Sequence, residues 1–354
     1  MNICFVEGDM SRKGGTERMT AMLANALSET HRVFVVSLKS EDNHVFFSLA
    51  DSVLHTVLPP AIGKMGILSQ VRQIHRFLLE QQIDCVINVD TGMSIYGIPA
   101  AWGTKAKVIT WEHANYYNNW GSRTFPYIRR FAARHSDAMV VLTGQDKRNY
   151  ETHIPSNVPV YAIANPVQRH EIHYDAASRT ILSAGALLPI KGYDRAIEVA
   201  KRILPSRPAW KWVICGEGPE REHLECLIRE AGLEKQVFLP GTLRDMEAQY
   251  RSAAMVVMTS HMEGLPMVLL EAKSYGLPLV SFDIMTGPRD IIEDGVNGSL
   301  IPPDNVGVMA EKICGLIDQP LLRKQFSENA ALDMDKFDRK AIVEKWMKLF
   351  RSLI

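Results

Sequence analysis

Thr259-Ser-His-Met-Glu-Gly-Leu-Pro-Met-Val-Leu-Leu-Glu271 is the stretch of this 354-residue chain that decides the fold. It follows an apolar run, residues 253–258, which has the length of a buried strand. It leads into a helical pattern at residues 269–275 that ends at Gly276. Pro266 lies at the expected first turn of this helix, where its missing N–H costs nothing. The stretch therefore predicts a strand, a tight loop and a helix start, an arrangement that binds anions through free N–H groups and the helix dipole.

Two carboxylates bracket this loop. Glu263 lies on the loop itself, and Glu271 lies eight positions later on the expected helix. Glu271 stands among apolar residues, and a glutamate in such surroundings is rarely buried without a partner. The alternative is a pair of solvated surface glutamates. Because carboxylates accept hydrogen bonds from ribose hydroxyls, their position beside an anion site indicates a nucleoside diphosphate with a further group attached.

Short apolar runs alternate with helical patterns along the whole chain, which is typical of parallel α/β sheets. The expected strands of the first half are residues 3–6, 33–38, 85–89, 108–111, 138–142 and 160–163. Those of the second half, after a polar linker at 168–179, are residues 181–184, 212–215, 237–239, 254–258, 279–282 and 299–301. We predict an α/β fold of two Rossmann-like domains, residues 1–166 and 167–335, that face each other across a deep cleft. The amphipathic helix within residues 336–354 is expected to return to the first domain.

Composition narrows the class of protein. Apolar residues make up 46% and charged residues 23%, as in soluble globular proteins. Lys+Arg and Asp+Glu are both 40, so the net charge gives no general attraction to nucleic acid. The five scattered cysteines form no CxxC pair, which predicts reduced thiols in a cytoplasmic protein and no metal site. We expect no signal peptide and no membrane-spanning helix, so that any membrane contact is peripheral.

Four loops after expected strands carry candidate binding groups. Gly14-Gly15 opens a helix and permits close approach of a phosphate or sugar, or it forms a structural turn. Trp111-Glu-His113 ends another strand, so His113 is a site residue or an ordinary loop histidine. Lys191 suits a diphosphate, with a plain surface lysine as the alternative. Thr286-Gly-Pro-Arg289 places Arg289 where it adds positive charge or pairs with an acid.

Residues 120–134, from Trp120 to Arg134, combine aromatic and basic side chains. The members are Trp120, Phe125, Tyr127 and Phe131 among Arg123, Arg129, Arg130 and Arg134. A helix of this kind lies on an anionic membrane surface, or packs on the core with a charged outer side.

The order and spacing of these motifs resemble the retaining glycosyltransferases of family 4, which have the GT-B fold. The Glu263…Glu271 pair matches the E-x7-E signature of that family. The other matching motifs of the second half are Lys191-Gly192, Gly216-Glu-Gly-Pro219, Thr286-Gly-Pro-Arg289 and Asn297-Gly298. In the first half the resemblance rests on Gly14-Gly15 and Glu112-His113.

The resemblance implies a role for each candidate residue. His113, Glu263 and Lys191 would be catalytic: Lys191 holds the donor diphosphate, Glu263 contacts the transferred sugar, and His113 lies near the reaction centre. Glu271 would bind the ribose hydroxyls. The backbone of Gly264, Leu265, Pro266, Met267 and Val268 would cap the phosphates, Gly241 and Leu243 would lie near the base, and Gly15 would approach the phosphate or the acceptor.

One position departs from the family pattern. The family usually has an arginine where this chain has Ala186, and that arginine acts with the lysine on the diphosphate. We expect another cation, Arg289 or Arg12, to replace it, or activity to be reduced.

The resemblance implies a hexosyltransferase that transfers a sugar with retention from a nucleotide diphosphate sugar, a UDP-sugar by family preference. The acceptor would be a saccharide or lipid-linked saccharide of bacterial surface polysaccharide assembly. No cofactor or metal would be required, and the protein would act in the cytoplasm, at the inner face of the membrane. A nucleotide-sugar 2-epimerase, which shares the fold, is one alternative. A non-catalytic sugar-nucleotide-binding subunit, suggested by Ala186, is the other.

Overall fold

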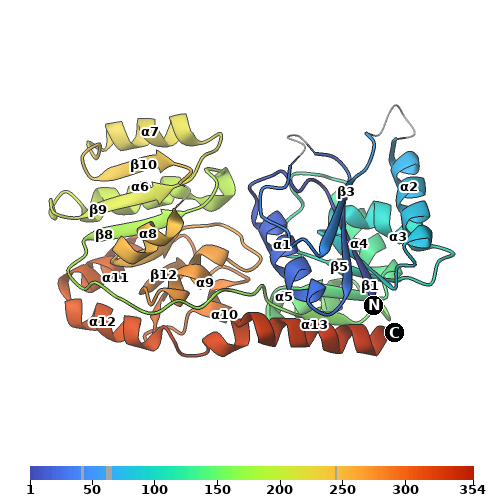
Figure 1. Ribbon diagram of the computed structural model, residues 1–354. Helices are drawn as coiled ribbons and strands as arrows, with labels where there is room; N and C mark the ends of the chain where they lie inside the picture. Colours follow the sequence, from blue (N-terminus) through green and yellow to red (C-terminus); the bar gives the residue numbers. More distant parts are fainter. Residues whose placement is uncertain (41–43, 61–65, 244) are drawn as a thin grey trace. The chain divides into compact units, whose positions relative to one another are not determined.

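The computed structural model describes residues 1–40, 44–60, 66–243 and 245–354, which form two α/β units (Figure 1). Unit 1 consists of Met1–Pro166 and Arg339–Ile354, and unit 2 consists of Val167–Asp338. Each unit is built on a single parallel sheet with helices packed on its faces. The predicted architecture of two Rossmann-like α/β domains is therefore confirmed.

The sheet of unit 1 has the strand order β3-β2-β1-β4-β5-β6-β7. Its strands are β1 (Asn2–Glu7), β2 (Arg32–Ser37), β3 (Val53–Val57), β4 (Cys85–Val89), β5 (Lys107–Trp111), β6 (Ala138–Val141) and β7 (Val160–Ala162). The sequence predicted six of them: the five inner strands, which are runs of mostly buried residues as expected for strands covered on both faces, and β7 at one edge. It missed the edge strand β3, in which only Val53 is buried.

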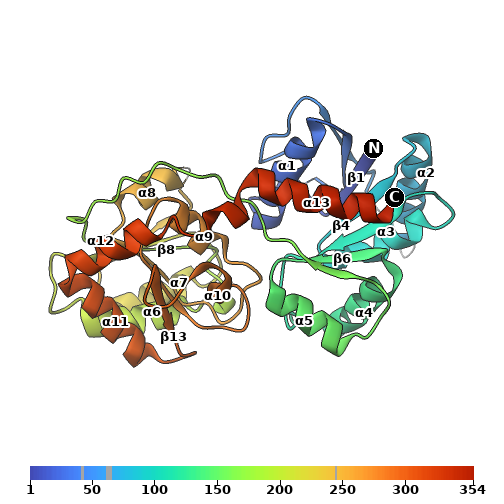
Figure 2. The same cartoon turned by 90° about the horizontal axis from the view of Figure 1, so that it is seen from below.

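The helices of unit 1 include one from the far end of the chain. They are α1 (Gly15–Ser28), α2 (Gly66–Glu80), α3 (Ser94–Ala101), α4 (Phe125–His135), α5 (Gly144–His153) and α13 (Arg339–Leu353), with a short 3₁₀ turn, η1 (Thr91–Met93). α13 lies beside α1 (Figure 2) and buries Ile342, Trp346 and Phe350. Trp346 meets Trp111 of β5 edge to face, with ring centroids 5.2 Å apart.

The sheet of unit 2 has the strand order β10-β9-β8-β11-β12-β13. Its strands are β8 (Thr180–Ala184), β9 (Lys211–Cys215), β10 (Val237–Gly241), β11 (Met255–Met258), β12 (Leu279–Phe282) and β13 (Gly298–Ile301). Its helices are α6 (Tyr193–Ile203), α7 (Arg221–Glu230), α8 (Met246–Ser252), α9 (Met267–Ser274), α10 (Pro288–Ile291), α11 (Val306–Asp318) and α12 (Pro320–Asn329), with 3₁₀ turns η2 (Pro189–Lys191) and η3 (Met334–Phe337). The strand order reverses between β8 and β11, and ligands of such sheets bind at this point, beyond the carboxyl ends of the strands.

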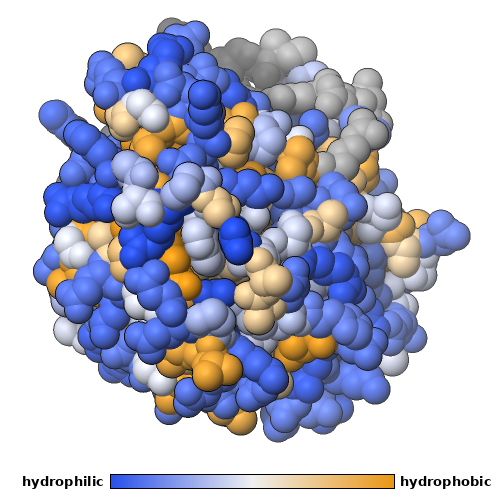
Figure 3. All heavy atoms as spheres, turned by 90° about the vertical axis from the view of Figure 1, so that its left-hand side faces the viewer, coloured by the Kyte–Doolittle hydropathy of each residue, from blue (hydrophilic) through white to orange (hydrophobic). Residues whose placement is uncertain are grey.

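The surface seen from the left of Figure 1 is mostly hydrophilic, with apolar residues in small separate areas (Figure 3). This is the ordinary character of a surface in contact with water. Within the described ranges, no helix is both long enough and apolar enough to cross a bilayer.

Candidate functional site

The strand–loop–helix junction predicted from the sequence is formed by β11, residues 259–266 and α9. α9 begins at Met267, two residues earlier than predicted, and Pro266 is its N-cap rather than part of the first turn. The backbone N–H groups of Leu269 and Leu270 donate to the carbonyl of Pro266, which closes the first turn. The N–H groups that precede them have no acceptor within the helix, as at every helix start, and free N–H groups of this kind favour an anionic ligand.

The loop after β12 supports the junction from one side. Thr286 is 1% exposed, and its hydroxyl donates to the carbonyl of Glu263. Gly287 has a φ of 98°, and a Cβ at this position would lie 2.4 Å from Pro266 Cδ and 2.8 Å from the carbonyl oxygen of Gly264. Only glycine fits here, so the close approach of the two loops fixes the backbone at Gly264.

Lys191 and Glu263 meet at the strand-order reversal. Lys191 ends η2, after β8, and its Nζ lies 2.7 Å from Glu263 Oε1. Ser260 Oγ donates to the same carboxylate oxygen at 2.6 Å. The backbone also joins the two loops, because His261 N donates to the carbonyl of Ile190. The structure thus brings together two residues that the sequence assigned to the donor's phosphate and sugar.

Glu271 is half-buried on α9, and one partner of its carboxylate is a residue that the sequence did not single out. The hydroxyl of Tyr250, on α8, donates to Glu271 Oε2 at 2.8 Å. The expectation that a glutamate in apolar surroundings has a partner is therefore confirmed.

Gly241 and Leu243 lie at the same edge of the sheet. Gly241 ends β10 with a φ of 85°, and its carbonyl accepts a hydrogen bond from Gly216 N, beyond the end of β9. A Cβ at Gly241 would lie 2.7 Å from Glu217 Oε1. Leu243 is half-buried in the loop that follows.

The two candidate replacements for the missing arginine are both paired with carboxylates. Ala186 itself is exposed. Arg289 Nε donates to Asp283 Oδ1 at 2.6 Å, and a second guanidinium nitrogen bonds the other oxygen of Asp283. Arg12 lies 3.6 Å from Glu17 Oε1. Either arginine would have to exchange its carboxylate for a phosphate, or share it, in order to take the missing role.

His113 follows β5 in unit 1, with its ring packed on Trp111 at a centroid distance of 4.1 Å. Its Nε2 has no hydrogen-bond partner among the described residues. Burial lowers the pKa of His113 to about 3, so the imidazole is neutral at neutral pH. A neutral imidazole accepts or donates a hydrogen bond without adding charge.

Glu112, next to His113, is fully buried and holds the turn that carries the histidine. Its carboxylate accepts hydrogen bonds from the hydroxyls of Thr91 and Tyr150 and from the backbone N–H of Ala114. Burial and the charge of Glu112 together raise the pKa of the neighbouring Asp146 to about 7. The sequence drew attention to the Glu112-His113 pair but gave no sign of the partners from two other segments, η1 and α5.

The two glycines at the start of α1 differ in the space around them. Gly15, the predicted site residue, is the first residue of α1, and a Cβ there would meet nothing within 4 Å. A Cβ at Gly14 would lie 2.1 Å from Glu17 Oε2, so a side chain at Gly14 would have to displace the Glu17 carboxylate.

The basic and aromatic segment is a helix only in part. α4 begins at Phe125, whereas Trp120 lies in the preceding turn with a φ of 50°. Arg129 is buried and bonds Asn118 and Asn119, but Tyr127, Arg130 and Arg134 are exposed. The exposed side of α4 is therefore basic with one aromatic ring.

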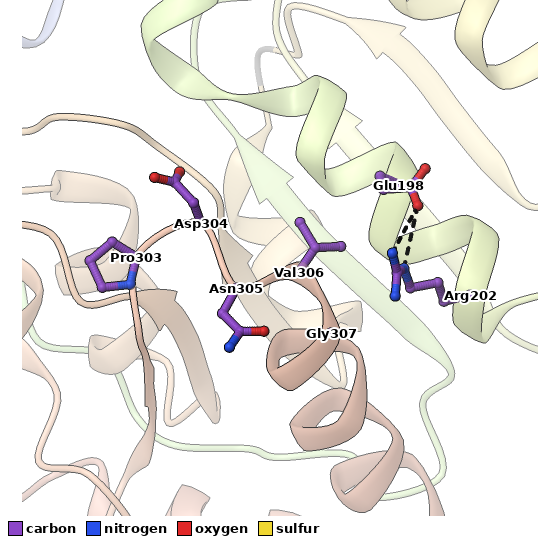
Figure 4. A pocket seen from close by; sticks show the side chains of 7 residues that line it. All are labelled: Glu198, Arg202, Pro303, Asp304, Asn305, Val306 and Gly307. Atoms are coloured by element: carbon purple, nitrogen blue, oxygen red, sulfur yellow. Dashed lines mark hydrogen bonds and ion pairs between the residues drawn. The ribbon is translucent and has the colours of Figure 1, made fainter.

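An open pocket of about 550 Å³ lies elsewhere on unit 2, between α6 and the start of α11 (Figure 4). Glu198 and Arg202, which face it, form an ion pair at 3.2 Å. None of the residues lining this pocket belongs to the candidate site, so we give it no part in the chemistry. No group of three metal-ligating side chains was found within the described ranges.

Comparison with known proteins gives the family. Residues 13–171 match the family model "Glycosyltransferase Family 4", and residues 167–333 match "Glycosyl transferases group 1". An uncharacterized glycosyltransferase of Haemophilus influenzae is 30% identical over 353 residues, which are 97% of this chain and 98% of the relative. The chain belongs to the GT-B glycosyltransferases.

Two further glycosyltransferases show what its relatives act on or bind. The Campylobacter jejuni GalNAc-alpha-(1->4)-GalNAc-alpha-(1->3)-diNAcBac-PP-undecaprenol alpha-1,4-N-acetyl-D-galactosaminyltransferase is 28% identical over 100% of this chain and 99% of its own length. TarM of S. aureus, solved in complex with fondaparinux, alpha-GlcNAc-glycerol and UDP, is 27% identical with a TM-score of 0.69. That match covers 79% of this chain and 58% of TarM.

Proposed function

We propose that this glycosyltransferase transfers a sugar, with retention of anomeric configuration, from a UDP-sugar to a saccharide or lipid-linked saccharide acceptor. The observation that carries the proposal is the meeting of Lys191 and Glu263 beside the start of α9, with Glu271 on the same helix. A cation and free N–H groups suit a diphosphate, and two carboxylates suit sugar hydroxyls. UDP in TarM and the undecaprenol-linked saccharide in the name of the Campylobacter jejuni relative support the choice of donor and acceptor.

The proposed reaction breaks the bond between the anomeric carbon and the diphosphate oxygen. The acceptor oxygen forms its bond to the anomeric carbon on the same face, and the acceptor's proton passes to the departing diphosphate. Negative charge grows on the diphosphate, where Lys191 and the N–H groups at the start of α9 stabilise it. These groups would make a metal ion unnecessary, and we propose that the enzyme needs neither metal nor cofactor.

The remaining roles follow the same proposal. Glu263 would contact hydroxyls of the transferred sugar, Glu271 would accept hydrogen bonds from the ribose, and Gly241 and Leu243 would lie near the base. In unit 1, neutral His113 would contact the sugar near the reaction centre, and Gly15 would approach the phosphate or the acceptor. Arg289 remains the proposed extra cation, provided that it leaves Asp283.

Binding and turnover of nucleotide sugars test this function. UDP should raise the melting temperature of the purified protein more than GDP or ADP, because a ligand that binds only the native state stabilises it. UDP-glucose, UDP-GlcNAc and UDP-GalNAc should then each be incubated with a lipid-linked saccharide extract in the presence of EDTA. An α-linked product, identified by the NMR coupling of its anomeric proton, is expected from an α-linked donor. A new nucleotide sugar formed without acceptor would indicate an epimerase, and nucleotide binding without turnover would indicate a non-catalytic subunit.

We also propose that the exposed side of α4 contacts an anionic membrane surface. Tyr127 is 69% and Trp120 58% exposed, and Arg130 and Arg134 lie on the exposed side of the helix. Each arginine near such a surface contributes about 1 kcal/mol. Replacing Arg130 and Arg134 by glutamate should therefore reduce cosedimentation with phosphatidylglycerol vesicles by more than about tenfold. The contact would be contradicted if the wild type and the variant sedimented equally with phosphatidylglycerol vesicles. It would also be contradicted if the wild type bound phosphatidylcholine vesicles as well as phosphatidylglycerol vesicles.

A further inference from the structure

Tyr250 connects the two helices on either side of β11. It lies on α8, and its hydroxyl donates to Glu271 Oε2, on α9, at 2.8 Å. The side chain is 3% exposed, so water does not compete freely for this hydrogen bond. The bond joins positions 21 residues apart in the chain.

The ring of Tyr250 is held by a stack of aromatic residues. It lies parallel to the ring of Tyr275, with centroids 5.2 Å apart and an interplanar angle of 17°. Tyr275 in turn stacks on His170, with centroids 4.0 Å apart and an angle of 16°. The guanidinium of Arg251 lies over the Tyr275 ring, 5.6 Å from its centroid. The phenolic oxygen is therefore fixed by packing, independently of Glu271.

We propose that Tyr250 is a positioning residue, which orients the Glu271 carboxylate for the ribose of the donor and sets the preference for ribonucleotides. This inference rests on the proposed role of Glu271. A glutamate side chain loses considerable rotamer freedom when a ligand fixes it, and this loss weakens binding. A carboxylate that Tyr250 already orients loses less rotamer freedom when the nucleotide binds. Its affinity for a ribose hydroxyl is therefore higher.

The hydrogen bond from Tyr250 is compatible with ribose binding. An ionised carboxylate has about four acceptor positions on its two oxygens, so it accepts ribose hydroxyls together with the phenol. A purely structural hydroxyl would have a different signature, because its loss would lower stability without changing how the protein distinguishes one nucleotide from another.

A thermodynamic cycle of two proteins and two ligands distinguishes a positioning role of Tyr250 from a purely structural one. The wild type and Tyr250→Phe are titrated calorimetrically with UDP and with its 2′,3′-dideoxy analogue. Tyr250→Phe keeps the ring and its stack, and is expected to weaken UDP binding by about tenfold, the scale of one hydrogen bond to a charged group. Binding of the dideoxy analogue should change by less than about twofold, because no ribose hydroxyl remains to reach Glu271.

The matched control is Tyr174→Phe, which removes a hydroxyl elsewhere in unit 2 that donates to the carbonyl of Ala254. It should leave both affinities unchanged. Equal weakening of both ligands by Tyr250→Phe, or no weakening of either, would overturn the positioning role while leaving the proposed function intact. A wild type that binds neither UDP, GDP nor ADP would contradict the proposed function and this inference together. Melting temperatures of the variants verify that each is folded at the titration temperature.

Discussion

At the scale of single residues, Lys191 is the most direct test of the donor site. Replacing it by alanine removes the cation that lies 2.7 Å from Glu263 and that we assign to the diphosphate. A hydrogen bond to a charged group contributes ~1.5–3 kcal/mol, so UDP affinity should fall by about 10- to 100-fold. Transfer should fall at least as far. Calorimetric titration with UDP measures the first effect and a turnover assay the second.

Lys211→Ala provides the control for Lys191→Ala. Lys211 is exposed at the start of β9, so its loss should change neither affinity nor turnover. A Lys191→Ala protein that binds UDP and turns over like the wild type would show that this lysine does not hold the diphosphate.

Some residues of the candidate site could be predicted from the sequence, and others could not. Glu263 and Glu271 were predicted because both lie in one continuous segment of strand, loop and helix. Their spacing can therefore be read directly from the sequence. The Tyr250 partner of Glu271 was missed, because a bond between side chains of two different helices leaves no local pattern. Arg289 was predicted as an available cation or as the partner of an acid, and the pairing with Asp283 depends on how the loop after β12 folds.

At the scale of elements, the contact between the loops after β11 and β12 should depend on Gly287. An alanine there would clash with Pro266 and Gly264 in addition to its strained positive φ. Overpacking costs ~1–3 kcal/mol and the backbone strain a further ~1–2 kcal/mol. Gly287→Ala should therefore lower the free energy of unfolding and weaken UDP binding at the same time. Denaturation and calorimetric titration measure these two quantities.

Gly295→Ala is the control for Gly287→Ala, because it measures the loss of stability that comes from backbone strain alone. Gly295 also has a positive φ, 76°, but a Cβ there would meet nothing within 4 Å. It should lose only ~1–2 kcal/mol of stability and bind UDP normally. If the two variants behave alike, packing between the loops does not shape the junction.

Helices and strands were predicted well where burial gives them a simple pattern of apolar residues in the sequence. The predicted strand at residues 279–282 coincides with β12, because parallel strands covered on both faces are continuous apolar runs. The end of α4 was predicted within one residue but its start was not, because Trp120 turns with a positive φ that aromatic side chains rarely adopt.

At the scale of the whole molecule, the chain's last helix completes the unit that its first residues begin. Trp346 of α13 is 1% exposed and packs on Trp111, which in turn contacts His113. Trp346→Ala should destabilise unit 1 by ~3–5 kcal/mol, the usual effect of removing a large buried aromatic side chain. Amide hydrogen exchange in β4 and β5 measures this loss within unit 1.

Trp102→Ala is the matched control, because Trp102 in the same unit is 61% exposed. It should leave exchange in these strands nearly unchanged. Unchanged exchange in Trp346→Ala as well would mean that α13 does not stabilise unit 1.

The central claim is that the junction between β11 and α9 binds the donor's diphosphate, and a crystal structure with UDP tests it most directly. We predict phosphate oxygens within hydrogen-bond distance of Lys191 Nζ and of the backbone N–H groups of residues 264, 265, 267 and 268, with a ribose hydroxyl on Glu271. UDP bound at another place, with the junction empty and Glu271 turned toward water, would contradict the account.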